Sequence, residues 1–321
     1  MATRKTASKT KAKSTDQIHK EVAGTVIEMM KTSGSDWIKS WSVGKNNQPT
    51  SMSTGNAYQG INWLILGMAK SANNYSTGQW ATYAQWFKMG GGVREGFELI
   101  TPSKYQVRKG SKSQMVILYK PMIIKDKDTG DEKSIPLMRS FNVFNADQIE
   151  GYTPEIDTEL DHVNTDQIIT LADTLAFEAG ATVKNDDLSS AFYVPSVDYI
   201  NMPKASQFKT ESDYSATLLH ELTHWSGHAK RCDRDLKNKF GTKDYAQEEL
   251  CAELGSAMLC GSLGISAQPR DDHAKYLNNW IERLTSDPKA IFKAAAAAQK
   301  AASFILDAQL VQQNLDEQKV A

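Results

Sequence analysis

The chain has 321 residues, 37 Lys and Arg against 38 Asp and Glu, and a hydrophobic content of 40%. This length is sufficient for two ordinary domains, and this apolar content excludes a chain that is disordered throughout. No stretch of about eighteen apolar residues occurs, which excludes a membrane-spanning helix. The three cysteines, Cys232, Cys251 and Cys260, have no paired spacing, so we expect reduced thiols in a cytoplasmic protein rather than a disulfide framework.

The charge is distributed unevenly along the chain. Residues 1–150 hold 21 Lys and Arg and 12 Asp and Glu, a net charge of +9, whereas residues 151–321 hold 16 and 26, a net charge of −10. The basic half is therefore where an anionic polymer is expected to bind. Its first residues, 1–14, are basic, rich in Ser, Thr and Ala, and without the apolar core of a secretory signal, so we expect a disordered tail.

Residues 15–150 predict a first domain that mixes helices and strands. A helix is expected over about 15–30, because apolar side chains recur there at helical spacing. A polar loop rich in Asn, Ser and Gly follows over 44–60. Two further apolar segments predict helices, 61–69 and 80–89. Short apolar runs then predict strands that end in a hairpin with its turn at 128–131: residues 107–110, 115–119, 123–124 and 139–144.

Residues 151–164 predict a linker, since they begin with Gly-Tyr-Thr-Pro and then hold many acids. Beyond them, residues 165–321 predict a second domain that is mainly helical. It is expected to contain a helix that ends before Gly180, a strand over 193–202 and a capping box at 210–213 that begins the next helix. The expected fold class is therefore α+β in two domains.

The clearest chemical motif is His220-Glu221-Leu222-Thr223-His224, inside the helix that follows the capping box. Residues four apart share one face of a helix, so both imidazoles can reach one metal ion while Glu221 lies beside it. Zinc is the expected metal, with another divalent ion as the alternative. In such a site Glu221 is the expected general base for attack of a zinc-bound water on an amide carbonyl.

A catalytic zinc site needs a third protein ligand and an open position for water. The metzincin pattern requires a histidine where this chain has Lys230, so that pattern is excluded. His228 is a local alternative, although it lies one turn further along the helix. A second source of ligands is the acidic cluster of residues 248–253, whose members Glu249 and Glu253 are four apart and share a helical face.

One of these two carboxylates can bind the metal while the other orients a ligating histidine. This layout resembles that of gluzincins, in which the first carboxylate is the ligand. The resemblance implies Glu249 as the ligand and Glu253 as the partner of a histidine. Glu248 is expected to point about a quarter turn away, as a solvated charge.

Further elements of a peptidase cleft can be suggested from the sequence. The strand over 193–202 is a candidate edge strand that would pair with an extended peptide. His273 and Tyr276 are candidate donors to the oxyanion of the transition state. Tyr276 also forms a helical stripe with Trp280 and Leu284, which favours packing in the core for this ring.

Tryptophan is concentrated in the basic half, which holds five of the seven tryptophans. Bases that stack on exposed aromatic rings beside a basic groove are typical of sequence-tolerant single-strand binding. Trp63, Trp80 and Tyr83 alternate with apolar helical positions and are expected in the core. The residues expected to contact DNA are the loop aromatics and their neighbouring polar and basic residues, namely Trp37, Trp41, Lys45, Tyr58, Asn62, Arg108, Lys109 and Lys112.

Several of these motifs resemble those of one known family. Three segments resemble the N-terminal module of ArdC-type antirestriction proteins, which TraC-type plasmid primases also carry: STGNAYQGIN at 53–62, VRKG at 107–110 and FNVFNADQIEG at 141–151. Three more resemble the family's C-terminal zincin-like domain: HELTHWSGH at 220–228, YAQEELCAE at 245–253 and YLNNW at 276–280. The resemblance covers roughly residues 15–310.

The resemblance implies a protein of a plasmid or phage that binds single-stranded DNA and protects incoming DNA from host restriction. It also implies a metal-bound, peptidase-like site, with a host restriction enzyme or another protein as a partner. Two alternatives remain at this stage, a DNA-targeted metalloprotease and a DNA-binding module whose zinc is not catalytic. Residues 93–106 are expected to be an insertion relative to the family, next to the DNA groove.

Overall fold

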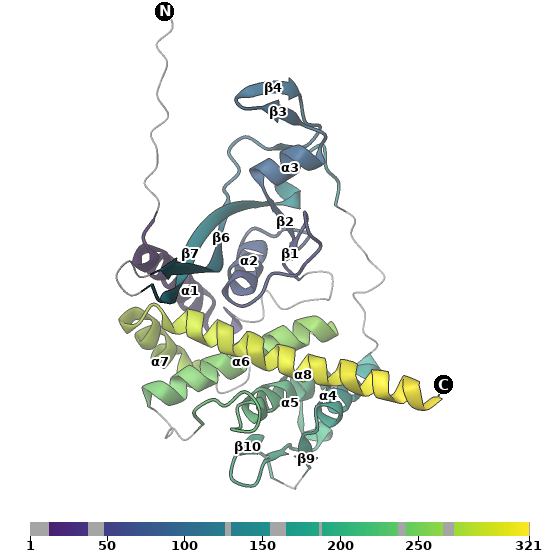
Figure 1. Cartoon of the computed structure of the whole chain (residues 1–321). Coiled ribbons are helices and arrows are strands. Elements are labelled where there is room, and N and C mark those ends of the chain that lie inside the picture. Colours follow the sequence, from purple (N-terminus) through teal and green to yellow (C-terminus); the bar gives the residue numbers. More distant parts are fainter. Residues whose placement is uncertain are drawn as a thin grey trace, which may run out of the picture.

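The computed structural model describes residues 13–37, 48–125, 130–154, 165–185, 188–236, 242–265 and 273–320. It has a mixed N-terminal part built on a β-sheet and a mainly helical C-terminal part beneath it (Figure 1). The predicted α+β fold class with two domains is therefore confirmed. Among the described helices, none combines the length and the apolar character that a membrane crossing requires.

The first helix, α1 (Thr15–Ser33), begins with a capping box in which Ser14 and Gln17 exchange side-chain and backbone hydrogen bonds. A short 3-10 helix, η1 (Gly34–Trp37), extends it. The helix buries one side along its whole length, including Ile18, Val22, Val26 and Met30. This is the side that the apolar spacing predicted.

The N-terminal sheet has the strand order β1-β2-β7-β6. Its long edge is the antiparallel pair β6 (Gln114–Lys125) and β7 (Glu132–Asn145), which confirms the predicted hairpin. Two shorter strands complete the sheet, β1 (Thr50–Ser51) and β2 (Gln79–Thr82).

The helix predicted over 80–89 is partly wrong. Residues 80–82 belong to β2 because they pair with β7, and α3 (Tyr83–Met89) starts only after a capping box at Thr82. The helix predicted at 61–69 is confirmed as α2 (Ile61–Ala72).

Four further strands follow α3 in two small sheets. The segment expected to be an insertion forms a hairpin, β3 (Val93–Glu95) and β4 (Glu98–Thr101), and β5 (Gln106–Val107) pairs with β8 (Ile149–Glu150). The 3-10 helix η4 (Ala146–Gln148) connects β7 to β8. Gly90 is required before the hairpin, since a Cβ there would lie 2.1 Å from Ser103 Oγ and 2.6 Å from the backbone nitrogen of Tyr105.

The C-terminal part is formed mainly by five helices: α4 (Thr165–Glu178), α5 (Glu211–Ser226), α6 (Lys243–Leu263), α7 (His273–Ser286) and α8 (Ala290–Val320). A three-stranded sheet of order β10-β11-β9 lies beside them: β9 (Thr182–Lys184), β10 (Phe192–Val194) and β11 (Tyr199–Asn201). The single strand predicted over 193–202 is thus two strands, joined by a turn at which Asp198 has a φ of 54°. The 3-10 helix η5 (Ala205–Gln207) leads to α5.

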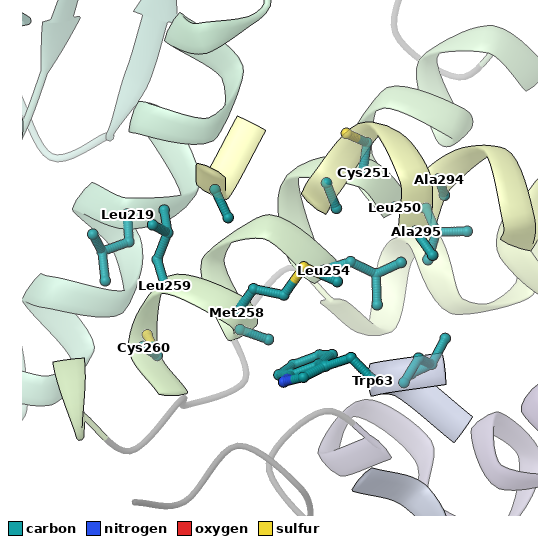
Figure 2. Packing of buried hydrophobic residues seen from close by; sticks show 14 of the residues in the cluster. Trp63, Leu219, Leu250, Cys251, Leu254, Met258, Leu259, Cys260, Ala294 and Ala295 are labelled. Atoms are coloured by element: carbon teal, nitrogen blue, oxygen red, sulfur yellow. The ribbon is translucent and has the colours of Figure 1, made fainter. Parts of the chain in front are cut away.

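The two parts share one hydrophobic core. Buried residues of α1 and α2 belong to the same cluster as those of α4 to α8. Trp63 of α2 lies beside Leu254 and Met258 of α6 in this core (Figure 2). The backbone nitrogen of Gly60 also donates to Gln299 of α8 at 2.9 Å. The basic half is therefore packed directly on α6 and α8 of the C-terminal part.

Candidate metal centre and nucleic-acid residues

The metal motif lies on α5, which packs against α6. The side chain of Ser256 on α6 donates to the carbonyl oxygen of Ala216 at 2.9 Å, and Gly255 lies against Thr223. A Cβ on Gly255 would come within 2.5 Å of the Thr223 methyl group, so only glycine permits this close approach. The packing places the acidic start of α6 opposite the two histidines of α5.

The side chains of His220, His224 and Glu249 converge on one point, and the atoms they offer as ligands lie within 4.8 Å of one another. The two Nε2 atoms are 3.1 Å apart, and the carboxylate oxygens of Glu249 lie 3.6 Å from Nε2 of His220 and 3.5 Å from Nε2 of His224. Neighbouring ligands of a tetrahedral zinc ion lie about 3.3 Å apart, given zinc–nitrogen bonds of about 2.0–2.1 Å. The arrangement therefore fits a divalent metal ion of this size.

Each histidine is held from behind by a second carboxylate. His220 Nδ1 lies 3.2 Å from Glu253 Oε1, and His224 Nδ1 lies 3.1 Å from Glu248 Oε1. Such contacts fix the ring orientation and direct each Nε2 toward the position that a metal would occupy. The Glu253 contact has the geometry that the sequence suggested.

The prediction for Glu248 is wrong, since its side chain is only 12% exposed rather than solvated. Glu248 accepts hydrogen bonds from Arg234, at 3.0 Å from Nε and 2.9 Å from Nη2. The α6 helix approaches the histidines so that adjacent residues of its first turns, Glu248 and Glu249, both reach them.

Arg234 ties this arrangement to the end of α5. Its Nη2 donates to the carbonyl oxygen of Thr223 at 2.6 Å, and its Nη1 donates to Ser226 Oγ at 3.0 Å. A Cβ at Gly227 would lie 2.9 Å from the guanidinium, so the glycine leaves room for it. Arg234 therefore both satisfies the last turn of the helix and holds the carboxylate that orients His224.

The histidines and carboxylates of this cluster shift one another's pKa. Burial lowers the pKa of His224, but its hydrogen bonds to Glu248 and Glu249 outweigh this effect and raise it to about 10. Burial raises the pKa of Glu249, but hydrogen bonds from His220 and His224 dominate and hold it well below its usual range. A proton and a divalent cation thus compete for the same site, because a histidine must be neutral to bind a metal.

A cavity of about 290 Å³ opens onto this cluster. Glu221, directly after the first histidine, is buried and forms part of its lining. Another wall comes from Phe192 and Tyr193 of β10, which is the outer strand of its sheet.

The β10 wall is anchored to the segment after α5. Tyr193 donates to Asp198 at 2.8 Å, and Arg231 donates to the same carboxylate at 3.0 Å. The hydrogen bond from Arg231 is the main reason that the pKa of Asp198 falls to about 2. Asp198 is therefore ionised at neutral pH, and the ion pair fixes the strand beside the metal motif.

Tyr276 is buried and stacks on Trp280, as the helical stripe indicated, yet its hydroxyl lies 3.4 Å from that of Tyr245. Both tyrosines line the cavity. Tyr245 is a site residue that the sequence reasoning missed. Burial, the hydrogen bond to Tyr276 and the nearby Glu249 carboxylate all raise its pKa, so it remains a proton donor.

His228 does not join the cluster, and the side chain of His273 is not described. His228 lies beyond the end of α5, where its Nδ1 accepts a hydrogen bond from the backbone nitrogen of Lys230 at 3.2 Å. It is not among the converging ligands. His273 is the first residue of α7, and its side chain lies outside what the structure describes.

The expected exposure of Trp37 is wrong. Its side chain is 0% exposed and packs edge-on against Trp280 of α7, with ring centroids 6.2 Å apart. The 3-10 turn η1 directs this ring into the shared core rather than into a polar loop. Trp41 and Lys45 lie outside the described residues.

The remaining DNA candidates lie on the sheet and its connections. Tyr58 is half-buried, whereas Arg108, Lys109 and Lys112 are exposed. Asn62 is engaged at both ends of its amide: it donates to the carbonyl oxygen of Ile117 at 2.6 Å and accepts from its backbone nitrogen at 2.7 Å. This side chain ties α2 to β6.

Two of the three aromatic residues expected in the core are buried, and the third is exposed. Trp63 and Trp80 are buried as expected. Tyr83 was expected in the core, but it is 52% exposed because it is the first residue of α3.

Comparison with protein families gives two matches. Residues 16–144 match the N-terminal domain of the anti-restriction factor ArdC, and residues 170–297 match a zincin-like metallopeptidase family. Among curated proteins, the chain is 34% identical over 300 residues to the uncharacterised protein y4eC of Sinorhizobium fredii, covering 90% of this chain and 91% of the relative.

The DNA primase TraC of Escherichia coli is 37% identical over 296 residues, 90% of this chain. The chain spans only 27% of the length of that primase.

Two solved structures of the antirestriction protein ArdC from plasmid R388 are also similar. The metal-free one has a TM-score of 0.72 and the Mn(II)-bound one a TM-score of 0.71. Both are 33% identical, and the match covers 91% of this chain and 97% of theirs. Similarity over nearly the whole of both chains, together with the two domain matches in the same order, shows that this chain belongs to the ArdC family of antirestriction proteins.

Proposed function

We propose that this protein binds single-stranded DNA of an incoming plasmid or phage, protects it from host restriction, and carries a zinc-dependent peptidase centre. The observation that supports the metal centre best is the convergence of His220, His224 and Glu249. Two histidines and one glutamate form a common ligand set of catalytic zinc sites, which keep a further position open for water. Both histidines are already oriented by carboxylates, so little reorganisation is needed when a metal binds.

Held by His220, His224 and Glu249, a zinc ion would supply Lewis-acid chemistry and would make a water molecule more acidic. The protein supplies the remaining chemistry. Glu221 accepts the proton of the attacking water and delivers it to the leaving nitrogen, so that an amide and water become a carboxylic acid and an amine. The buried position of Glu221 in the cavity wall favours this role.

Two further elements of the cavity fit the same reaction. The hydroxyl of Tyr245 is a protonated donor close to Glu249, suited to the oxygen that becomes negative in the transition state. The β10 strand is the outer strand of its sheet and lines the cavity, so an extended peptide can pair with it. We assign Tyr245 this donor role together with, or in place of, Tyr276 and His273.

Binding to single-stranded DNA is supported by the net charge of +9 on residues 1–150 and by the match of residues 16–144 to the ArdC N-terminal domain. The similarity to a DNA primase agrees with a module that handles nucleic acid. Protection against restriction is proposed because the similar protein of plasmid R388 is an antirestriction protein.

Glu221→Gln tests whether the two activities depend on each other. We would measure zinc content, cleavage of a mixed peptide library, and transfer of unmethylated plasmid into a restricting host, each for the wild type and the variant. The proposal predicts peptide cleavage that is lost in the variant while zinc is retained. No cleavage by the zinc-loaded wild type, with protection intact in both proteins, would overturn the peptidase role and leave a DNA-binding protein with a non-catalytic metal.

A further inference from the structure

The β6–β7 pair presents one face that changes from apolar to basic along its length. Directly opposed residues of an antiparallel pair lie on the same side of the sheet. Val116 opposes Phe141, Leu118 opposes Arg139, and Lys120 opposes Leu137. Apolar side chains therefore lie next to two cations on one surface, and both Lys120 and Arg139 are exposed.

The start of this face is covered by α2, where Leu66 packs with Val116 and Val143. Beyond α2 the covering ends, and Leu118 and Phe141 are 47% and 43% exposed. A hollow of about 880 Å³ lies at this point, between the sheet, the loop before α2 and the start of α3. It is separate from the cavity at the metal motif, with which it shares no lining residue.

The walls of this hollow combine three kinds of group. Phe141, Leu118 and the half-buried Tyr58 provide apolar and aromatic surface. Amide side chains in the lining, those of Asn56 and Gln59, supply both donors and acceptors. The cations of the same sheet face lie at the next positions along the strands.

A nucleobase has the complementary chemistry. Its faces stack on aromatic and apolar side chains, its edges hydrogen-bond with amides, and the backbone phosphates of the strand that carries it attract cations. In a duplex the base faces are already stacked on one another, so a hollow of this kind favours an unpaired strand.

We propose that the hollow between β6–β7 and the loop at residues 56–62 is a nucleobase-binding site, in which a base of single-stranded DNA stacks on Phe141 while Arg139 and Lys120 bind adjacent phosphates. This inference rests on the proposed binding of single-stranded DNA and gives it a location. Arg108, Lys109 and Lys112 precede the start of β6, and Lys120 lies near its middle. Cations therefore lie toward both ends of the apolar stretch. The path along the chain from Lys112 to Lys120 is about 27 Å long, at about 3.4 Å per residue.

A second exposed apolar group in this half is the β3–β4 hairpin, whose turn residue Phe97 is fully exposed. Its neighbours in the turn include Glu95 and Glu98, and carboxylates repel phosphates. The hairpin therefore lacks the charge that a DNA site needs. Phe97 provides a matched control, because it is an exposed phenylalanine of the same half that does not line the hollow.

The test uses the full chain and fluorescence anisotropy at fixed salt, with a labelled thymidine oligonucleotide and an abasic oligonucleotide of equal length. The wild type is expected to bind the thymidine strand more tightly. Phe141→Ala is expected to weaken binding of that strand by about 5- to 150-fold, the change that corresponds to one stacked base, and to leave abasic binding within about twofold. Phe97→Ala is expected to change neither.

Two further variants separate stacking from charge and from folding. Phe141→Leu keeps apolar bulk in the sheet but has no ring, so it is expected to lose most of the difference between the two strands. Arg139→Gln removes a phosphate contact and is expected to weaken both strands equally, with a smaller dependence on salt. Unchanged thermal unfolding of each variant would show that the fold is intact.

The outcomes distinguish this inference from the proposed function. Tight binding by the wild type that Phe141→Ala leaves unchanged, or that Phe97→Ala weakens instead, would overturn the site but not DNA binding. Equal affinity of the wild type for thymidine and abasic strands would also overturn the site but not DNA binding. Absence of any binding by the wild type would overturn both. Photo-crosslinking from 5-iodouracil is expected at Phe141 or Tyr58, and crosslinks confined to the hairpin or to the metal cavity would also contradict the site.

Discussion

The candidate metal centre and the proposed DNA-binding face are built in opposite ways. The candidate metal centre is buried, and its groups come from two short stretches of sequence at helical spacing on α5 and α6. The proposed DNA-binding face is exposed and is assembled from a loop, a helix start and two long strands. A buried polar group needs every partner in place, whereas an exposed surface tolerates substitution. The two sites should therefore respond very differently to single changes.

The largest expected effect is a loss of stability, which tests whether Trp37 belongs to the shared core or to the proposed DNA-binding surface. Trp37→Ala should destabilise the whole protein by about 3–5 kcal/mol, because it removes a fully buried ring from the core that both halves share. Chemical denaturation with tryptophan fluorescence and circular dichroism would measure this change. A loss of DNA affinity without loss of stability would instead return Trp37 to the DNA-binding surface.

The next effect concerns the carboxylates behind the histidines. Glu248→Gln and Glu253→Gln should each weaken zinc binding by roughly 10- to 100-fold, since they leave the ligands in place but loosen the orientation of one ring. Competition with a fluorescent chelator would give both affinities. Glu178→Gln, on α4, is a control outside the cluster, and an equal effect of that variant would rule out a specific role for the two carboxylates.

A third prediction follows from the raised pKa of His224. Because the folded, metal-free protein holds this proton up to about pH 10 rather than 6.5, zinc must displace it at neutral pH. Apparent zinc affinity should thus keep rising above pH 7, by up to about tenfold per pH unit, with release of about one proton. Calorimetry in buffers of different ionisation enthalpy would count the protons.

The same pKa has a stability consequence with the opposite sign. In the metal-free protein, the proton on His224 stabilises the fold fully below about pH 6.5, and this contribution is lost as the pH rises toward 10.

Zinc affinity that stays constant above pH 7, with no proton released, would show that the carboxylates do not hold the histidine protonated.

The smallest effects are expected on the exposed side. Lys109→Gln and Lys112→Gln should each weaken single-strand binding only a few-fold and lower the salt dependence by about one contact, without changing zinc content. Binding isotherms at several salt concentrations would measure the affinity and its salt dependence. A loss of zinc in either variant would mean that the two regions are not separable.

The sequence predicts best what is local. The spacing of His220, His224, Glu249 and Glu253 follows from the helical period, and the structure brings these four together. The prediction for Glu248 was wrong and Tyr245 was missed, because the roles of both residues depend on the angle at which α6 meets α5. That angle is set by contacts such as Gly255 against Thr223, which no local pattern reveals.

In the basic half, local sequence patterns predict the structure less well than they do at the metal motif. The β6–β7 hairpin was predicted from its apolar runs, but β2 was taken for part of a helix, since its strand character comes from pairing with β7 about 60 residues away. Trp37 was misplaced because only the fold shows that Trp280 lies beside it. The hollow at Phe141 could not be seen in the sequence, because its lining comes from four separate segments.

The most direct test of the central claim is zinc binding by Glu249→Gln, measured by calorimetry and elemental analysis against the wild type and His228→Ala. We predict one zinc per wild-type chain, unchanged binding in His228→Ala, and a loss of affinity of about a hundredfold or more in Glu249→Gln, because one of three protein ligands is removed. Full zinc binding by Glu249→Gln, or its loss in His228→Ala, would contradict the assignment of the metal centre to His220, His224 and Glu249.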